Sequence, residues 1–228
     1  MPLIKFNNIT KEYEPGRKAL DAISFNIDDG EFIFLVGPSG AGKSTVVKLL
    51  IKEDTPNEGI IEFDGQNILD IPVTDINHLR RRVGVVFQDF KLLDSRNVYD
   101  NVAVALEVAN ATDKEIRNIV PSVLSLVGLA DRISNFPKQL SGGEKQRVSI
   151  ARALAHEPDV LIADEATGMI DPDSADEIVS ILEKINSLGT TVVMATHDER
   201  IVDKLKKRVI RIENGKVVSD KKGGKYRA

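Results

Sequence analysis

The sequence predicts an α/β fold with a mixed sheet at its core and a helical segment inserted between the strands. Residues 31–36 form a near-continuous apolar run, which is typical of a strand buried on both faces of a parallel sheet. Residues 160–163 and 190–195 repeat this pattern towards the other end of the chain. Between them, from about residue 97 to residue 155, the apolar positions follow a helical period. With 228 residues, the chain is long enough to bury one substantial core.

Short strands joined by tight turns are expected at the N-terminus. Residues 3–9 and 19–27 are rich in β-branched and aromatic side chains. Pro15-Gly16 marks a turn between them, and Asp28-Asp29-Gly30 marks a turn after them. These signals predict an N-terminal antiparallel β subdomain.

The remaining strand candidates lie in the body of the protein. Residues 59–63 and 83–87 have strand composition, and residues 209–212 followed by Asn214-Gly215 predict a closing hairpin. Residues 219–228 are polar and contain glycine, so this tail is expected not to pack on the fold.

The middle of the chain predicts three helices, over residues 98–108, 113–127 and 142–155. Thr112 and Glu115 form a capping-box pattern that starts the second helix. We therefore predict a single domain, with a helical subdomain at about residues 89–158 inserted in an α/β body of residues 1–88 and 159–228.

Composition excludes several classes of protein. The net charge is −4, with 31 Lys and Arg against 35 Asp and Glu, so no general attraction to nucleic acid or anionic lipid is expected. The absence of Cys rules out a disulfide framework, a thiolate metal site and a Cys nucleophile. No stretch reaches the ~18 apolar residues that span a bilayer, and the N-terminus lacks a signal-peptide pattern. The expected location is the cytoplasm, with any membrane association provided by a partner.

The segment Gly37-Pro38-Ser39-Gly40-Ala41-Gly42-Lys43-Ser44 matches a phosphate-binding loop, and Thr45 follows it. Glycines let backbone N–H groups face a polyphosphate, Lys43 can reach the β- and γ-phosphates, and Ser44 can bind Mg²⁺. A flexible Gly/Ser linker would share this composition. The position between a buried strand and a helix favours phosphate binding, because the N-terminus of a helix attracts anions.

Two acids end the strand at residues 160–163. Asp164 can hold the water shell of a metal ion, and Glu165 can act as general base towards an attacking water. A solvated acidic turn is the structural alternative. The combination with a phosphate-binding loop favours nucleotide hydrolysis.

Leu140-Ser141-Gly142-Gly143-Glu144 combines two features. Ser141 and Glu144 form a capping box that opens the third helix. The two glycines also make this helix N-terminus a second phosphate-binding surface, for which a single ATP already held by the first loop has no obvious use. A second subunit would explain its presence.

Together with Gln88, Asp171 and His197, these motifs resemble those of the ABC ATPases, in the same order along essentially the whole chain. The resemblance implies a RecA-like P-loop NTPase core that hydrolyses ATP with Mg²⁺. It also implies a homodimer that encloses two ATP molecules head to tail. ABC proteins that act on DNA or ribosomes usually carry a coiled-coil or zinc insertion or two fused cassettes, and neither appears in this sequence, so no nucleic-acid partner is expected. Each cassette would then supply Ser141, Gly142, Gly143, Glu144 and Asp171 to the ATP held by its partner.

The resemblance also assigns roles to residues that are weak signals alone. Tyr13 would stack on adenine, although an aromatic residue there could be simply a surface residue. Gln88 would contact Mg²⁺ and the attacking water, and His197 would hold the γ-phosphate. The sequence departs from the family pattern at Ala166, where proline is usual, and at Met169-Ile170, where Asn-Leu or Ala-Leu is usual. We expect Ala166 to loosen the backbone around Glu165.

Within the family, residues 83–93, 97–102 and 195–198 are most similar to the cassettes of bacterial cell division. That similarity implies an integral membrane partner resembling FtsX, and signalling through it to cell-wall hydrolases from the cytoplasmic face of the membrane. Lipoprotein-release and macrolide-type exporters have similar motifs, and a dimerising scaffold with little hydrolysis is the other alternative. We hypothesise that Phe90, Leu92 and Leu93 line a groove for a helix of the partner, although they could instead pack the helical subdomain onto the body.

Overall fold

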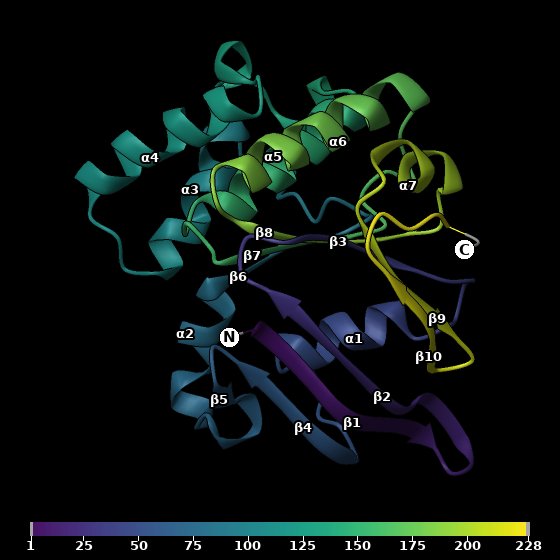
Figure 1. Ribbon diagram of the computed structural model, residues 1–228. Helices are drawn as coiled ribbons and strands as arrows, with labels where there is room; N and C mark the ends of the chain where they lie inside the picture. The colour runs from purple at the N-terminus through teal and green to yellow at the C-terminus, as the bar shows by residue number, and fades with distance from the viewer. Residues whose placement is uncertain (1, 227–228) are drawn as a thin grey trace.

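The computed structural model describes residues 2–226, and in this range the strands form two sheets (Figure 1). The larger sheet has the order β10-β9-β3-β8-β7-β6. Its strands are β3 (Phe32–Val36), β6 (Val83–Val86), β7 (Val160–Asp164), β8 (Thr191–Thr196), β9 (Arg208–Glu213) and β10 (Lys216–Lys221). All neighbours pair in parallel except β9 and β10, which form the predicted closing hairpin.

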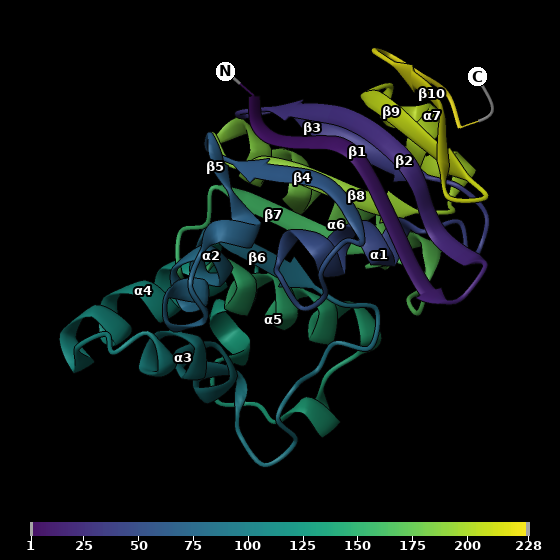
Figure 2. The ribbon, with the colours of Figure 1, turned by 90° about the horizontal axis from the view of Figure 1, so that it is seen from below.

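The second sheet is antiparallel and has the order β2-β1-β4-β5. Its strands are β1 (Pro2–Glu14), β2 (Arg17–Asp28), β4 (Glu58–Phe63) and β5 (Gln66–Asn67). Helix α1 (Lys43–Leu50) lies between the two sheets, as Figures 1 and 2 show. The N-terminal antiparallel β subdomain predicted from the sequence is confirmed.

Strand β3 is apolar throughout because each of its faces covers a different core. Phe32, Phe34 and Val36 pack against the helices on one face of the large sheet. Ile33 and Leu35 pack into a second core formed with α1 and the antiparallel sheet. Burial of alternate side chains on opposite faces follows from the two-residue repeat of a strand.

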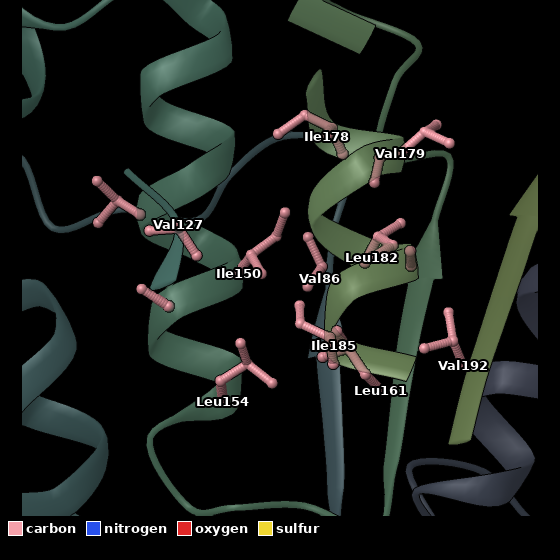
Figure 3. Close-up of a cluster of buried hydrophobic side chains, with 14 of the residues drawn as sticks. Val86, Val127, Ile150, Leu154, Leu161, Ile178, Val179, Leu182, Ile185 and Val192 are labelled. Atoms are coloured by element: carbon pink, nitrogen blue, oxygen red, sulfur yellow. The ribbon is translucent and has the colours of Figure 1, made fainter. Parts of the chain in front are cut away.

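Helices cover the outer face of the large sheet. They are α3 (Val98–Val108), α4 (Asp113–Leu126), α5 (Gly142–Leu154), α6 (Pro172–Ser187) and α7 (Glu199–Leu205). Helix α2 (Ile76–Arg82) instead packs through Leu79 into the core on the α1 side of the sheet. Figure 3 shows Ile150 of α5 and Leu182 of α6 meeting Val86 and Leu161 of the strands. The predicted capping box of Thr112 and Glu115 starts α4.

Strands β1 and β2 and helices α4 and α5 begin or end at other residues than predicted. Strand β1 continues beyond residue 9 to Glu14, and β2 begins already at Arg17, because the polar residues between them pair across the hairpin. Helices α4 and α5 each end one residue earlier than predicted. These changes leave the order of the elements as predicted.

The prediction that residues 219–228 would not pack is wrong. Strand β10 extends to Lys221, and the N–H of Gly224 donates to the carbonyl of Lys207. Tyr226 packs against the helical core, its N–H donates to Asp203 and its carbonyl accepts from Arg211. Backbone hydrogen bonds therefore hold this polar segment, which composition could not reveal. Residues 227 and 228 of the predicted tail lie outside the described residues.

Among residues 2–226, no helix is both long enough and apolar enough to cross a bilayer. The proposed subdomain boundaries stay a prediction, since α5 packs against β6 and α6 as well as against α3 and α4.

Candidate functional site

The phosphate-binding loop connects β3 to α1. Gly37, the first residue of the loop, has φ +153°, and a methyl group there would lie 2.0 Å from the Ile212 carbonyl oxygen. Gly42, at the N-cap of α1, has φ +111°, and a methyl group would lie 2.6 Å from the Ala19 carbonyl oxygen. Both positions exclude a side chain by close approach and by backbone conformation. The loop therefore runs tightly against neighbouring backbone and leaves its other side open to the cleft.

Lys43 is the cation at the base of this loop. Its side chain is buried, and Nζ donates to the carbonyl oxygens of Gly37 at 2.8 Å and of Pro38 at 3.3 Å. Nζ also lies 3.5 Å from Oε1 of Glu165. The ammonium is therefore paired with two carbonyl oxygens of its own loop and with one carboxylate.

Asp164 and Ser44 form the second part of the site. The Ser44 hydroxyl donates to the Asp164 carboxylate, while Oδ1 of Asp164 is buried with no hydrogen-bond partner among the described residues. Burial raises the pKa of Asp164 above its ordinary value. A buried carboxylate oxygen without a partner, next to a hydroxyl, suits a divalent cation with oxygen ligands and bound water. The residues present therefore fit Mg²⁺.

Glu165 connects the phosphate-binding loop to His197. Its Oε2 lies 2.7 Å from Nδ1 of His197, while Oε1 is the atom that faces Lys43. The two residues come from the ends of neighbouring strands, β7 and β8, and the N–H of Glu165 donates to the Ala195 carbonyl. Glu165 has φ +52°, an unfavourable region for a residue with a Cβ. Parallel pairing of β7 and β8 thus brings together two side chains separated by 32 residues.

Gln88 follows β6 and closes the same cleft. Its Nε2 would lie 3.3 Å from a methyl group at Gly168, so its amide rests on the loop after Glu165. A cleft of about 510 Å³ is lined by Gln88, Glu165 and His197, and by residues 39–45 of the phosphate-binding loop and the start of α1. A second cleft beside it is lined by Ser44, Gln88, Asp164 and Glu165. The structure thus brings together the residues predicted for the phosphates, the metal and the attacking water.

Tyr13 lies on β1, close to the start of α1. Tyr13 is 52% exposed, and Nζ of Lys11 lies 4.9 Å from the centroid of its ring. The phenol hydroxyl contacts the side chains of Thr45 and Asp54, and burial raises the pKa of Tyr13 above its usual value. An exposed ring fixed through its hydroxyl next to the phosphate-binding loop can stack on a planar base.

The signature segment lies away from the two clefts. Ser141 caps α5: its Oγ accepts from the N–H of Glu144, and its own N–H donates to the Glu144 carboxylate at 2.8 Å. This hydrogen bond, with Arg132 nearby, lowers the pKa of Glu144. A methyl group at Gly143 would lie 2.7 Å from Ser174, near the start of α6, and Asp171 caps that helix. None of residues 141–144, nor Asp171, is among the residues that line either cleft.

The three hydrophobic residues predicted to form a partner groove differ in burial. Leu92 packs partly against the helical core, Phe90 is partly buried and Leu93 is 41% exposed. Leu92 therefore also has the packing role that was the alternative to a groove.

Sequence reasoning missed the side chains that hold the loop after Gln88. Arg152 donates to two backbone carbonyls of this loop, and Asn101 bonds to the backbone of Leu93. An arginine and an asparagine on helices carry no recognisable signal, because their partners are main-chain atoms of another segment. Ala19, which lines the larger cleft, was likewise not predictable.

Comparison with known proteins decides the family. Residues 20–168 match the family model described as ABC transporter. The chain belongs to the ABC transporter family. It is 48% identical over 226 residues to the cell division ATP-binding protein FtsE of Streptococcus pneumoniae strain D39, covering 99% of this chain and 98% of the relative. It is 50% identical over 224 residues to the FtsE protein of Bacillus subtilis strain 168, covering 98% of each chain.

A solved structure supports the same conclusion. The chain is similar to the ATP-binding cassette MJ0796, with a TM-score of 0.86, 35% identity, and coverage of 97% of this chain and 99% of that one. That structure is a dimer in a post-hydrolysis state with bound ADP and Pi. The predicted P-loop NTPase fold class is thereby confirmed, and the chain is an ATPase of the ABC type that binds ATP.

Proposed function

We propose that this chain is the ATP-hydrolysing subunit of a cell-division complex, working as a homodimer beneath an integral membrane partner that resembles FtsX. The chain would lie at the cytoplasmic face of the membrane and transmit its ATP cycle to cell-wall hydrolases. The observation that supports this most is the Lys43–Glu165–His197 arrangement within a phosphate-binding cleft, in a chain 48–50% identical to two FtsE proteins over nearly its full length.

ATP binding begins with a change of partners at Lys43. The ammonium leaves the carbonyl oxygens of Gly37 and Pro38 and turns to the β- and γ-phosphates, whose negative charge is a stronger acceptor. Backbone N–H groups of the loop and the N-terminus of α1 face the remaining phosphate oxygens. Tyr13 stacks on the adenine, which places the nucleotide lengthwise along the loop.

The Ser44 hydroxyl, Gln88 and, through water, Asp164 would hold Mg²⁺. When bound, Mg²⁺ neutralises the charge that develops on the phosphate oxygens. The unpartnered Oδ1 of Asp164 supports this assignment, because a bound cation with its waters would satisfy it.

Hydrolysis then depends on Glu165 being released from its two neighbours. The Glu165 carboxylate contacts both Lys43 and His197. Once these two groups turn to the γ-phosphate, Glu165 can accept a proton from the attacking water, and Gln88 orients that water. His197 stabilises charge on the γ-phosphoryl group as the bond to the leaving group breaks.

The signature segment completes the site of a second copy of this chain. Its helix N-terminus can approach the γ-phosphate held by the partner cassette, where Ser141 and the N–H groups of Gly142 and Gly143 would donate hydrogen bonds. Its distance from the clefts of its own chain supports a role across the dimer. Glu144 keeps Ser141 in place, and Asp171 lies next to the dimer contact.

Phe90, Leu92 and Leu93 are the proposed contact with the membrane partner. They follow Gln88 directly, so a helix seated against them would be linked to the site of hydrolysis through the backbone of one loop. The exposed side chain of Leu93 supports this proposal more than the partly packed Leu92 does.

The test is to measure Mg²⁺-dependent phosphate release by the purified chain alone and with the FtsX-like protein reconstituted in lipid bilayers. We expect low turnover alone and stimulation by the membrane protein. ATP-induced dimerisation without turnover in both conditions would favour the scaffold alternative. Stimulation by a lipoprotein-release or macrolide-export membrane subunit, and not by the FtsX-like protein, would favour an exporter.

A further inference from the structure

The loop that carries Gln88 is held to helix α5 by buried or partly buried polar side chains. At its start, Nε2 of Gln146 donates to the Phe87 carbonyl at 3.4 Å, and Gln146 is fully buried. Further along, the guanidinium of Arg152 donates to the carbonyls of Phe90 at 2.9 Å and Lys91 at 2.6 Å. Gln88 therefore sits between two attachments to the same helix.

Arg152 is an unusual member of this set because it has no acidic partner. Within residues 2–226, no carboxylate is paired with its guanidinium, and burial lowers its pKa. The two loop carbonyls are the hydrogen-bond acceptors that the structure gives to this charge. Desolvation of a partly buried guanidinium costs free energy, and main-chain carbonyls have no full charge to offset it. The benefit of Arg152 is therefore expected in the conformation of the loop segment that it binds.

The conformation of the loop depends on these bonds. Phe90 and Lys91 have φ +59° and +50°, so two consecutive residues with Cβ atoms occupy the left-handed region. This turn directs both carbonyl oxygens to Arg152. Without the guanidinium, the two carbonyls lose a charged donor and the turn can relax towards ordinary backbone geometry.

The far end of the loop is fixed independently. The N–H of Leu93 donates to Oδ1 of Asn101 at 2.7 Å, and Nδ2 of Asn101 donates back to the Leu93 carbonyl at 3.1 Å. Asn101 is fully buried on α3, so it would restrain Leu93 if the turn at Phe90 and Lys91 relaxed. Without Arg152, the relaxation would then reach Gln88, whose amide rests on Gly168.

We propose that Arg152 is a positioning residue for Gln88, which locks the Gln88 loop to the helix that begins with the signature segment. Ser141, at the N-terminus of α5, is proposed to contact the nucleotide held by the partner. Arg152, in the last turn of α5, binds the loop that carries Gln88 in the nucleotide site of the same chain. Arg152 therefore joins the two sites of the dimer through a single helix. The inference rests on the proposed role of Gln88, and the test separates the two.

The experiment is a double-mutant cycle on the full chain, with kcat, KM for ATP and the Mg²⁺ concentration for half-maximal turnover measured for Arg152→Met, Gln88→Ala and the double variant. We expect Arg152→Met to lower kcat about tenfold and to raise the Mg²⁺ requirement, with little change in KM. In the Gln88→Ala background, the same substitution should change kcat by less than about twofold, because Gln88 is no longer there to be positioned.

Arg147→Met is the matched control. Arg147 lies on the same helix and pairs with Glu177 on α6 rather than with the Gln88 loop, so its effect should add to that of Gln88→Ala. If Arg152→Met does not fold, Arg152→Lys, which retains a charge and can donate to the loop carbonyls, replaces it and should show a smaller, equally non-additive loss. Additive effects of Arg152 and Gln88 substitutions overturn the inference. No effect of Gln88→Ala by itself overturns the proposed role of Gln88.

Discussion

Nδ1 of His197 and Oε2 of Glu165 lie 2.7 Å apart, at the ends of two neighbouring parallel strands. The other oxygen of Glu165 faces Lys43 at 3.5 Å. The proposed general base therefore contacts both groups that are proposed to bind the γ-phosphate, so ATP would compete with it for them.

This competition leads to a prediction for Glu165→Gln. Turnover should fall by about 10²–10⁴-fold, the contribution of a general base. ATP affinity should rise, because a neutral amide holds Lys43 and His197 less strongly than a carboxylate does. Phosphate release and binding of a fluorescent ATP analogue measure the two effects. Unchanged turnover would contradict the assigned role of Glu165.

Helices α4 and α5 both begin with a capping box. A comparison of variants at the two caps therefore separates an effect on helix stability from an effect on the partner's nucleotide site. Ser141→Ala and Thr112→Ala each remove the side chain that caps a helix, α5 and α4, and each should cost ~1 kcal/mol of unfolding free energy. We expect Ser141→Ala alone to weaken ATP-induced dimerisation and turnover. Light scattering and phosphate release provide the comparison with Thr112→Ala as control. Equal activity of the two variants would argue against a role for Ser141 in trans.

Asp164→Asn should stabilise the nucleotide-free chain while impairing its use of Mg²⁺. Burial raises the pKa of Asp164 above its value in the unfolded chain. The folded state therefore binds this proton more tightly, and stability is lost as the pH rises through the raised pKa. Asparagine removes this penalty at neutral pH. We expect a higher Tm at pH 7, no such gain near pH 3, and a higher Mg²⁺ requirement; a lower Tm at pH 7 would contradict this account.

Ala166→Pro tests the departure from the family pattern. Glu165 has φ +52°, and a following proline disfavours helical conformations in the residue before it. Proline should move Glu165 towards extended backbone and weaken its contacts with Lys43 and His197. We expect basal turnover to rise about threefold, which phosphate release measures directly. If turnover does not change, Ala166 has no part in setting the rate.

Leu93→Asp tests the proposed partner groove. A charge at this exposed position should abolish co-purification with the FtsX-like membrane protein and leave ATP binding and Tm unchanged, because the side chain is 41% exposed. Leu188→Asp is the control, since Leu188 is 69% exposed and follows α6, away from the Gln88 loop. Retained co-purification of Leu93→Asp would remove the groove from the proposal.

Part of the candidate site is predictable because its chemistry is local. Residues 37–44 need only their own glycines and lysine to form a phosphate-binding loop, and Ser141 with Glu144 forms a complete helix cap within four residues. The position of β3 was also predictable, since a strand buried on both faces is apolar throughout. When the residues that form a hydrogen bond or a buried strand are close in sequence, the order of residue types is enough to predict the structure.

The sequence by itself determined the family, the order of the elements and the ATP-binding motifs. Only the tertiary structure decided that Glu165 rests between Lys43 and His197, that Arg152 holds the Gln88 loop, and that the tail packs through Tyr226. The physical reason is common to these contacts. Their partners are main-chain carbonyls or side chains distant in sequence, and strand pairing and helix packing, rather than any local pattern, bring them within hydrogen-bond distance.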